Sequence, residues 1–136
     1  MSNCIFCRIV SGDIPSSVVY EDEDFKAIMD IAPASRGHVI ILAKKHFDNL
    51  YALEDDVAAK VLIVARKIAF AMKEELGCDG INLLQNNGVA AGQTVFHLHF
   101  HLLPRYKDDN VEIDWSHGKY EDGEAAMIAK RIAERI

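Results

Sequence analysis

The sequence predicts an α+β fold with a mostly antiparallel sheet and one long helix. Short apolar runs rich in β-branched residues occur in both halves of the chain, and each is bounded by turn residues. Between them lies one long stretch with apolar residues at helical spacing. No repeat, linker or low-complexity tract divides the 136 residues, which are enough to bury a core. We therefore expect a single domain, residues 1–136.

Three segments of the N-terminal half are predicted strands: residues 18–20, 25–31 and 38–43. The acidic turn EDED separates the first two, and the loop IAPASRG precedes the third. The third segment, HVIILA, is continuously apolar, which is typical of a buried strand. Residues 4–11 are expected to form a turn of helix or a loop.

The long helix is predicted over residues 57–76. Acidic residues at positions 54–56 suit its first turn, and Gly77 suits its end. A strand over residues 81–86 and a strand containing the histidines follow. The tail, GEAAMIAKRIAERI, predicts a C-terminal helix. The apolar positions at helical spacing are Val57, Val61, Val64, Ala65, Ile68, Met72 and Leu76 in the long helix, and Ala125, Ile128, Ile132 and Ile136 in the tail.

Composition and charge exclude several classes of protein. The formal net charge is −6 and there is no basic stripe, so a nucleic-acid polymer or an anionic membrane is a poor partner. The apolar runs are too short to span a bilayer, and the N-terminus lacks the pattern of a targeting segment. We therefore expect a cytoplasmic protein whose three cysteines stay reduced.

The segment HLHFHLL, which begins at His97, carries the clearest chemical signal. Side chains alternate between the two faces of a strand, so His97, His99 and His101 share one face. The other face presents Phe96, Leu98, Phe100 and Leu102, which we expect to pack on the core under the long helix. The histidine face is therefore available to line a site.

Two kinds of chemistry suit three histidines in alternation. They can chelate a metal, or one imidazole can attack a substrate while its neighbours orient it and protonate the leaving group. The preceding loop, NNGVAAGQT, favours the second kind, because its small residues allow backbone N–H groups to approach an anion. Its glycines and polar side chains predict a phosphate cradle made of Asn86, Asn87, Gly88, Gly92, Gln93 and Thr94.

The sequence resembles the histidine triad (HIT) family, and in particular its Hint-like bacterial branch. HLHFHLL matches the family pattern of three histidines separated by apolar residues. Around this motif the resemblance covers three family blocks in the same order: CIFCRIVSGDIPSSVVYEDEDFKAIMDI, GHVIILAKKH and NNGVAAGQTVFHLHFHLLPRY, the last of which contains the motif. The resemblance implies a sheet of roughly five antiparallel strands with a long helix and a C-terminal helix. It also implies a homodimer with a continuous sheet.

The resemblance assigns roles to four histidines. His99, the middle histidine, would be the nucleophile that attacks the α-phosphorus of a nucleotide and forms a nucleotidyl-histidine intermediate. His101 would contact the phosphate and assist the leaving group, and His97 would orient the site. His38 resembles a buried histidine that supports His97 by hydrogen bonding.

The resemblance also implies binding residues. Asp30 resembles the acid that binds the ribose hydroxyls, a role that suits a carboxylate because it only accepts hydrogen bonds. Asn86, Gly92, Gln93 and Thr94 match the phosphate-side loop. The apolar slot for the base would contain Ile5, Phe6, Ile9 and Ile28, for which simple core packing is an equally good interpretation.

A second cluster begins with the CxxC pair Cys4 and Cys7. The pair could be two semi-buried thiols or a redox pair, because a closed zinc site requires four ligands. Bacterial members that this chain resembles complete such a site with the histidine after the Lys-Lys pair, here His46, and the first histidine of the triad, here His97. The zinc would then be structural, and no organic cofactor is expected.

The predicted function is hydrolysis of purine nucleoside phosphoramidates or related adenylates. One alternative is the hydrolysis of dinucleoside polyphosphates, which uses similar chemistry. Another is a zinc-stabilised nucleotide-binding interaction protein with incidental catalysis. A third makes His97, His99 and His101 the ligands of a catalytic zinc ion.

Overall fold

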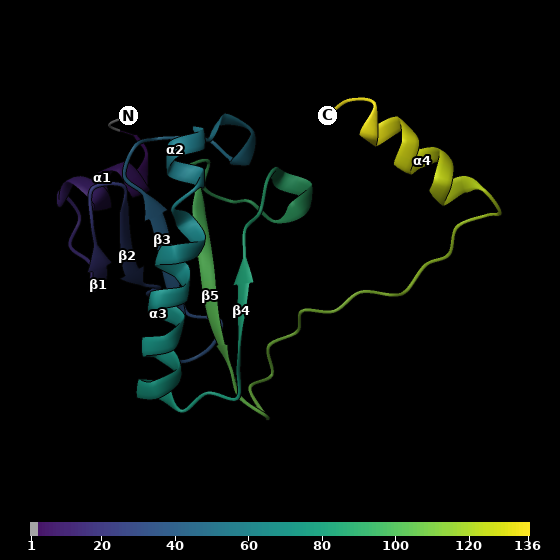
Figure 1. Cartoon of the computed structure of the whole chain (residues 1–136). Helices are drawn as coiled ribbons and strands as arrows, with labels where there is room; N and C mark the ends of the chain where they lie inside the picture. Colours follow the sequence, from purple (N-terminus) through teal and green to yellow (C-terminus); the bar gives the residue numbers. More distant parts are fainter. Residues whose placement is uncertain (1–2) are drawn as a thin grey trace.

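The computed structural model describes residues 3–136 and contains a five-stranded sheet with the order β1-β2-β3-β5-β4 (Figure 1). Every neighbouring pair of strands is antiparallel. The predicted α+β fold and its antiparallel sheet are confirmed. The strands are β1 (Val18–Glu21), β2 (Phe25–Met29), β3 (Val39–Ala43), β4 (Gly80–Leu84) and β5 (His99–Arg105).

The expected helix over residues 57–76 is divided into α2 (Asp55–Ala58) and α3 (Val61–Leu76). At the turn between them, the Lys60 N–H donates to the Val57 carbonyl three residues back. This bond winds the chain more tightly than an α-helix does, so the helix is interrupted although the apolar spacing continues. Gly77 ends α3 as predicted, with φ of 61° and its N–H bonded to the Lys73 carbonyl.

The two faces of the sheet carry different cores. On one face, α3 packs against apolar side chains from β2, β3, β5 and the residue before β5. They include Leu98, Phe100 and Leu102, as predicted. On the other face, α1 (Ile5–Ser11) contributes Phe6 and Ile9 to a smaller cluster, which also contains Ile28, Ile40 and Leu42. The histidines lie on this second face, beside α1.

The predicted ends of several elements are wrong for local reasons. β2 stops at Met29 because the Asp30 carboxylate accepts a hydrogen bond from the Ala32 N–H and turns the chain. β5 starts at His99, since residues 95–97 form a bend. In this bend Phe96 does not pack under the helix as expected, and its side chain is 44% exposed. β4 ends at Leu84, because the amides of Gln85 and Asn87 bond to each other.

The C-terminal segment leaves the body of the protein. Residues 109–121 belong to no helix or strand, and α4 (Glu124–Ala133) lies apart from the sheet (Figure 1). The predicted helix is therefore present, but it ends before Ile136. Its residues are not buried. No helix among residues 3–136 is long and apolar enough to cross a membrane.

Candidate active site and metal centre

A cavity of about 240 Å³ lies between α1, the ends of β2 and β3, and the start of β5. It brings together eight residues that the sequence singled out: Ile5, Phe6, Ile9, Ile28, Asp30, Thr94, His99 and His101. Sequence reasoning missed other wall residues, namely Ile14, Pro15, Ser16, Met29, Ile31, Ile40 and Val95. Their apolar or small side chains gave no signal that separated them from ordinary core. The lining of the cavity is mostly apolar and includes a carboxylate and two imidazoles.

His99 is held in one tautomer. Its Nδ1 lies 2.6 Å from the carbonyl oxygen of His97, an acceptor, so Nδ1 carries the proton. The lone pair is therefore on Nε2. The edge of the Phe6 ring packs against the imidazole, with ring centroids 4.9 Å apart. Only 8% of the surface of His99 is exposed, and its orientation is fixed by a backbone carbonyl rather than by a carboxylate.

His101 is oriented by a chain of hydrogen bonds through His38. The Ala34 N–H donates to Nδ1 of His38, so the proton of His38 is on Nε2. That N–H donates to Nδ1 of His101 at 2.9 Å, which leaves the proton of His101 on its own Nε2. The expectation that His38 supports His97 is therefore wrong. His38 supports His101, because the antiparallel pairing of β3 and β5 sets its neighbour Ile40 opposite His101.

The pKa values agree with neutral imidazoles. Burial lowers the pKa of His101 to about 4, and the neighbouring His99 and His38 contribute in the same direction. Burial also lowers the pKa of His99 and of His38. The Asp30 carboxylate lies 3.6 Å from Nδ1 of His38 and opposes the effect of burial. Because the Ala34 N–H donates to Nδ1 of His38, this nitrogen carries no proton. We therefore regard His38 as neutral and its contact with Asp30 as a proximity without an ion pair.

A second cluster gathers the four predicted zinc ligands. The ligand atoms of Cys4, Cys7, His46 and His97 all lie within 4.8 Å of one another. His97 Nδ1 is 3.4 Å from the Cys4 sulfur and 3.5 Å from the Cys7 sulfur. His46 Nδ1 is 3.3 Å from the Cys7 sulfur and 3.2 Å from His97 Nδ1. Cys4, which caps the N-terminus of α1, and Cys7 within α1 thus meet histidines from two distant loops.

The outer nitrogens of both histidines are occupied by acceptors. His97 Nε2 lies 2.6 Å from the Ala43 carbonyl, and His46 Nε2 lies 2.9 Å from the Asp48 carboxylate. Each outer nitrogen therefore carries a proton, and each Nδ1 turns its lone pair toward the sulfurs. The sequence analysis missed Asp48. Its signal was the spacing of two residues from His46, which allows a carboxylate to reach the imidazole.

The donor set and its spacing fit a zinc ion. Two thiols and two imidazole lone pairs are a common tetrahedral set, for which Zn–N of 2.0–2.1 Å and Zn–S near 2.3 Å give ligand separations of about 3.3–3.6 Å. The N···N and N···S distances of 3.2–3.5 Å agree. Burial and the adjacent Cys4 thiol raise the pKa of Cys7, so the sulfurs repel a second negative charge unless a cation joins them. With His97 Nδ1 facing this cluster, the three triad imidazoles do not converge on a shared metal.

The phosphate-side loop is held by its own polar side chains. Gln93 is buried, accepts from the Gly88 N–H, and donates to the carbonyls of Asp48 and Val95. Its amide is thus used within the fold, and the expectation that it contacts substrate is wrong. Gly92 has φ of 92°, and a Cβ there would lie 3.6 Å from the Asn86 amide nitrogen. Thr94 is exposed at the mouth of the cavity.

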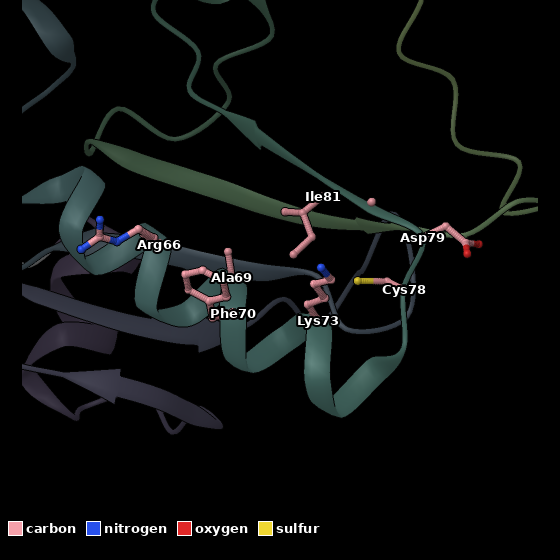
Figure 2. Close-up of a pocket in the computed structure, with 8 residues that line it drawn as sticks. Arg66, Ala69, Phe70, Lys73, Cys78, Asp79 and Ile81 are labelled. Carbon is pink, nitrogen blue, oxygen red and sulfur yellow. The ribbon is translucent and has the colours of Figure 1, made fainter.

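A different cavity of about 310 Å³ lies between α3 and β4 (Figure 2). Its walls contain Arg66, Phe70, Lys73, Cys78 and Ile81, with no histidine. It lies on the helix-covered face of the sheet, so it is separate from the histidine site.

Comparison with known proteins gives the family. A model of the HIT domain matches residues 11–108. The chain belongs to the HIT family. Among HIT relatives, Protein hit of Bacillus subtilis is 42% identical over 98% of this chain and 94% of its own length. Adenosine 5'-monophosphoramidase hnt1 of Schizosaccharomyces pombe is 34% identical over 98% of both chains. Adenylylsulfatase HINT3 of Arabidopsis thaliana is 39% identical over 99% of this chain and 70% of its own length.

Solved HIT structures share the fold. A HIT family protein from Bacillus anthracis superposes with a TM-score of 0.92 and 41% identity, over 98% of this chain and 97% of its own. Residues 107–136 are more than a fifth of the chain, so a superposition that misplaced them could not reach this score. A Zn-bound histidine triad family protein from Mycobacterium smegmatis has a TM-score of 0.77 and 39% identity, over 97% of this chain and 98% of its own.

Proposed function

We propose that this HIT protein hydrolyses purine nucleoside phosphoramidates or related adenylates at the α-phosphorus, with His99 as the nucleophile. The observation that carries the proposal is the tautomer of His99, whose Nδ1–H is held by the His97 carbonyl while Nε2 keeps its lone pair. That imidazole lines a cavity with mostly apolar walls and a carboxylate, which suits a base and a ribose. The relatives named as an adenosine monophosphoramidase and an adenylylsulfatase favour the same substrate class.

In the first step, the Nε2 lone pair of His99 forms a bond to the α-phosphorus. The phosphorus–nitrogen bond to the leaving amine breaks, and its electron pair stays on the amine, which takes up a proton from solvent. The nucleotidyl imidazole now carries a positive charge. The His97 carbonyl stabilises this charge through Nδ1–H, at a distance of 2.6 Å.

In the second step, water attacks the same phosphorus and releases a proton to solvent, while the phosphorus–nitrogen bond to His99 breaks and its electron pair returns to Nε2. Nucleoside monophosphate leaves and the neutral imidazole is restored. Splitting the reaction in this way replaces one difficult displacement with two easier ones.

His101 assists both steps. Because its pKa is lowered to about 4, the ring is neutral near pH 7 and offers its Nε2–H to a phosphate oxygen or to the leaving group. Asp30 binds the ribose hydroxyls, and Ile5, Phe6, Ile9 and Ile28 form the slot for the base. The phosphate side is formed by Asn86, Gly92 and Thr94.

Cys4, Cys7, His46 and His97 would hold a structural zinc ion. All four positions are protein ligands, so the ion would stabilise the fold and offer no open position for water. It would join α1, which forms one wall of the cavity, to the residue that orients His99 through its carbonyl.

We also propose that two copies pair along β4. Within residues 3–136, β4 has a neighbouring strand on one side only, so its other edge can extend the sheet. Apolar side chains surround this edge: Leu83 on β4 is 42% exposed, and Leu62 and Phe70 on α3 are more than 60% exposed. A patch of this kind is typical of a subunit interface.

Two alternatives make different predictions. A dinucleoside polyphosphate hydrolase would use the same histidines and differ in the pocket for its leaving group. A nucleotide-binding interaction protein would bind nucleotide and turn it over negligibly. Rates on an adenosine phosphoramidate and on a diadenosine polyphosphate, compared with nucleotide affinity, distinguish the three.

A single-turnover reaction tests the nucleophile. The chain is mixed with an adenosine phosphoramidate, quenched early and weighed as intact protein. We expect a transient AMP adduct on the native chain and none on His99→Ala, followed by AMP release from the native chain alone. Normal turnover by His99→Ala would contradict the proposal. Absence of adduct and product on both substrates, with nucleotide binding retained, would favour the binding protein.

A further inference from the structure

The first turn of α1 brings two thiols together. Cys4 is the N-cap of the helix, and its sulfur accepts a hydrogen bond from the Cys7 N–H at 3.4 Å. Both sulfurs belong to a group of ligand atoms that all lie within 4.8 Å of one another. Residues three apart on a helix are neighbours, with Cβ atoms about 5–6 Å apart. Because a disulfide requires Cβ atoms about 3.5–4.5 Å apart, side-chain rotation and a slight closure of this turn are enough to form one.

These two thiols are accessible, whereas the third cysteine of the chain is not. Cys4 and Cys7 are half-buried, and Cys78 is buried with 8% of its surface exposed. An oxidant must reach a sulfur before it can react, so exposure decides which thiols are oxidised first. Cys78 is therefore an internal control within the same chain.

The groups around these thiols favour their reactive form. Nδ1 of His97 lies 3.4 Å from the Cys4 sulfur, and Nδ1 of His46 lies 3.3 Å from the Cys7 sulfur. A cation held by these four side chains deprotonates both thiols, and the thiolate is the form that attacks a peroxide. The site thus presents two adjacent and accessible thiolates.

We propose that Cys4 and Cys7 are an oxidation site for hydroperoxides, at which a disulfide closes, the metal is released and the chemistry at His99 slows. The inference goes beyond the proposed hydrolase activity, but it rests on the proposed metal centre. The co-substrate is a hydroperoxide such as hydrogen peroxide, which is small and uncharged and therefore reaches half-buried sulfurs.

The oxidation takes place in two displacements. One thiolate attacks an oxygen of the hydroperoxide, the oxygen–oxygen bond breaks, and the departing alkoxide or hydroxide takes a proton from solvent. That sulfur is then a sulfenic acid. The second thiolate attacks it, the sulfur–oxygen bond breaks, and hydroxide leaves and takes a second proton from solvent. Two electrons pass from the sulfurs to the peroxide, and a thiol reductant reverses the change.

The effect of oxidation reaches His99 through His97. Once the sulfurs are joined, the Nδ1 lone pairs of His46 and His97 face each other at 3.2 Å without a cation between them. His46 can turn outward, but His97 is fully buried and keeps a ring nitrogen without a partner, which destabilises the segment before β5. The backbone carbonyl of His97 lies 2.6 Å from Nδ1 of His99, so a shift of this segment moves the nucleophile.

Thiol counting on the zinc-loaded full chain tests the oxidation site. The chain is treated with hydrogen peroxide, unfolded, alkylated at its remaining thiols and weighed. We expect a monomer that takes one alkyl group, at Cys78, where the untreated chain with its three cysteines takes three. The matched control is Cys78→Ala, which should lose both remaining thiols at the native rate. Three free thiols after treatment, or a covalent dimer on a non-reducing gel, would overturn the proposal.

Metal release is measured in the same samples with a chromogenic zinc indicator. We expect one zinc ion to be released for each disulfide formed, and a thiol reductant with added zinc should restore the metal content. A chain that keeps its zinc after complete oxidation would overturn this inference alone. A chain that holds no zinc before treatment would overturn the proposed metal centre as well.

Turnover gives a third readout. We expect kcat of the oxidised chain to fall at least about tenfold, because the nucleophile is displaced, and to recover when a thiol reductant and zinc are added. An unchanged kcat in the fully oxidised chain would contradict the effect on His99. The thiol and zinc measurements do not depend on catalysis, so they test the oxidation site even where the proposed substrate class is wrong.

Discussion

The protein has two histidine clusters that lie next to each other near the start of β5. The protons on the imidazole nitrogens are arranged oppositely in the two clusters. In the cluster of Cys4, Cys7, His46 and His97, the Nδ1 lone pairs of both imidazoles point toward the sulfurs. Their Nε2–H groups point outward and donate to the Ala43 carbonyl and the Asp48 carboxylate. Around His99 and His101, donors and acceptors alternate, and each chain of hydrogen bonds ends at an unpaired Nε2. The first arrangement suits a cation at its centre, whereas the second leaves the Nε2 lone pair of His99 and the Nε2–H of His101 available to a substrate.

This difference shows that the chemistry available to a histidine depends on which of its ring nitrogens donates a hydrogen bond to the protein, because the other nitrogen then keeps the lone pair. His97 and His99 are two residues apart and both buried, but one gives its Nε2–H to a carbonyl and the other its Nδ1–H. The remaining lone pair then faces the sulfurs in one case and belongs to Nε2 in the other. The following substitutions test this division, from the largest expected effect to the smallest.

Removing the nucleophile should have the largest effect on activity. We expect His99→Ala to lower kcat by at least about 1,000-fold, because the covalent route is lost. Its zinc content should stay at that of the native chain, since His99 is outside the metal cluster. Steady-state kinetics and elemental analysis measure the two properties. A fall in zinc equal to the fall in activity would show that the two clusters are not separate.

Removing a metal ligand should have the largest effect on stability. We expect Cys7→Ser to lose zinc and to lower Tm by about 10 °C, which corresponds to about 2–4 kcal/mol for a chain of this size. Cys78→Ser is the matched control, because Cys78 is a buried cysteine outside the cluster. Thermal unfolding with and without chelator measures the effect. If the native chain and Cys7→Ser unfold alike, the cluster holds no stabilising metal.

Disrupting the support of His101 should slow the reaction without abolishing it. His38→Ala removes the donor to His101 Nδ1, and loss of orientation is expected to lower kcat up to about 100-fold. His38→Gln keeps an N–H near the position of Nε2 and should recover part of the rate. A chemical role that requires the imidazole itself would make Gln and Ala equally slow.

The smallest expected effect is on stability at acid pH. Burial lowers the pKa of folded His101 to about 4, against about 6.5 in the unfolded chain, so the unfolded state binds more protons between these values. The contribution of His101 to the free energy of unfolding therefore has its full value above pH 6.5 and decreases as the pH drops toward 4. We expect a loss of about 1–2 kcal/mol, because the ring is partly exposed. Denaturant titrations should show a shallower fall for His101→Asn than for His117→Asn.

The strand pattern and the spacing of apolar residues predicted most of the fold. Leu98, Phe100 and Leu102 pack under α3 as the alternation predicted, because side-chain direction in a strand is a local property. The same argument failed for Phe96, since residues 95–97 bend before the strand begins. Where loops close over the histidines, local periodicity carries no information.

The sequence by itself determined the fold class, the family and which side chains are the candidates for chemistry. Alternation and helical spacing are properties of residues close together in the chain, and the order of the family blocks is read along the chain without any knowledge of its contacts. Tertiary structure alone decided which ring nitrogen of each histidine carries the proton and that His38 donates to His101. It also decided that the Gln93 amide is bonded within the fold and that the C-terminal helix does not pack on the sheet. These features depend on hydrogen bonds and contacts between distant segments, and only the packed chain brings those segments together.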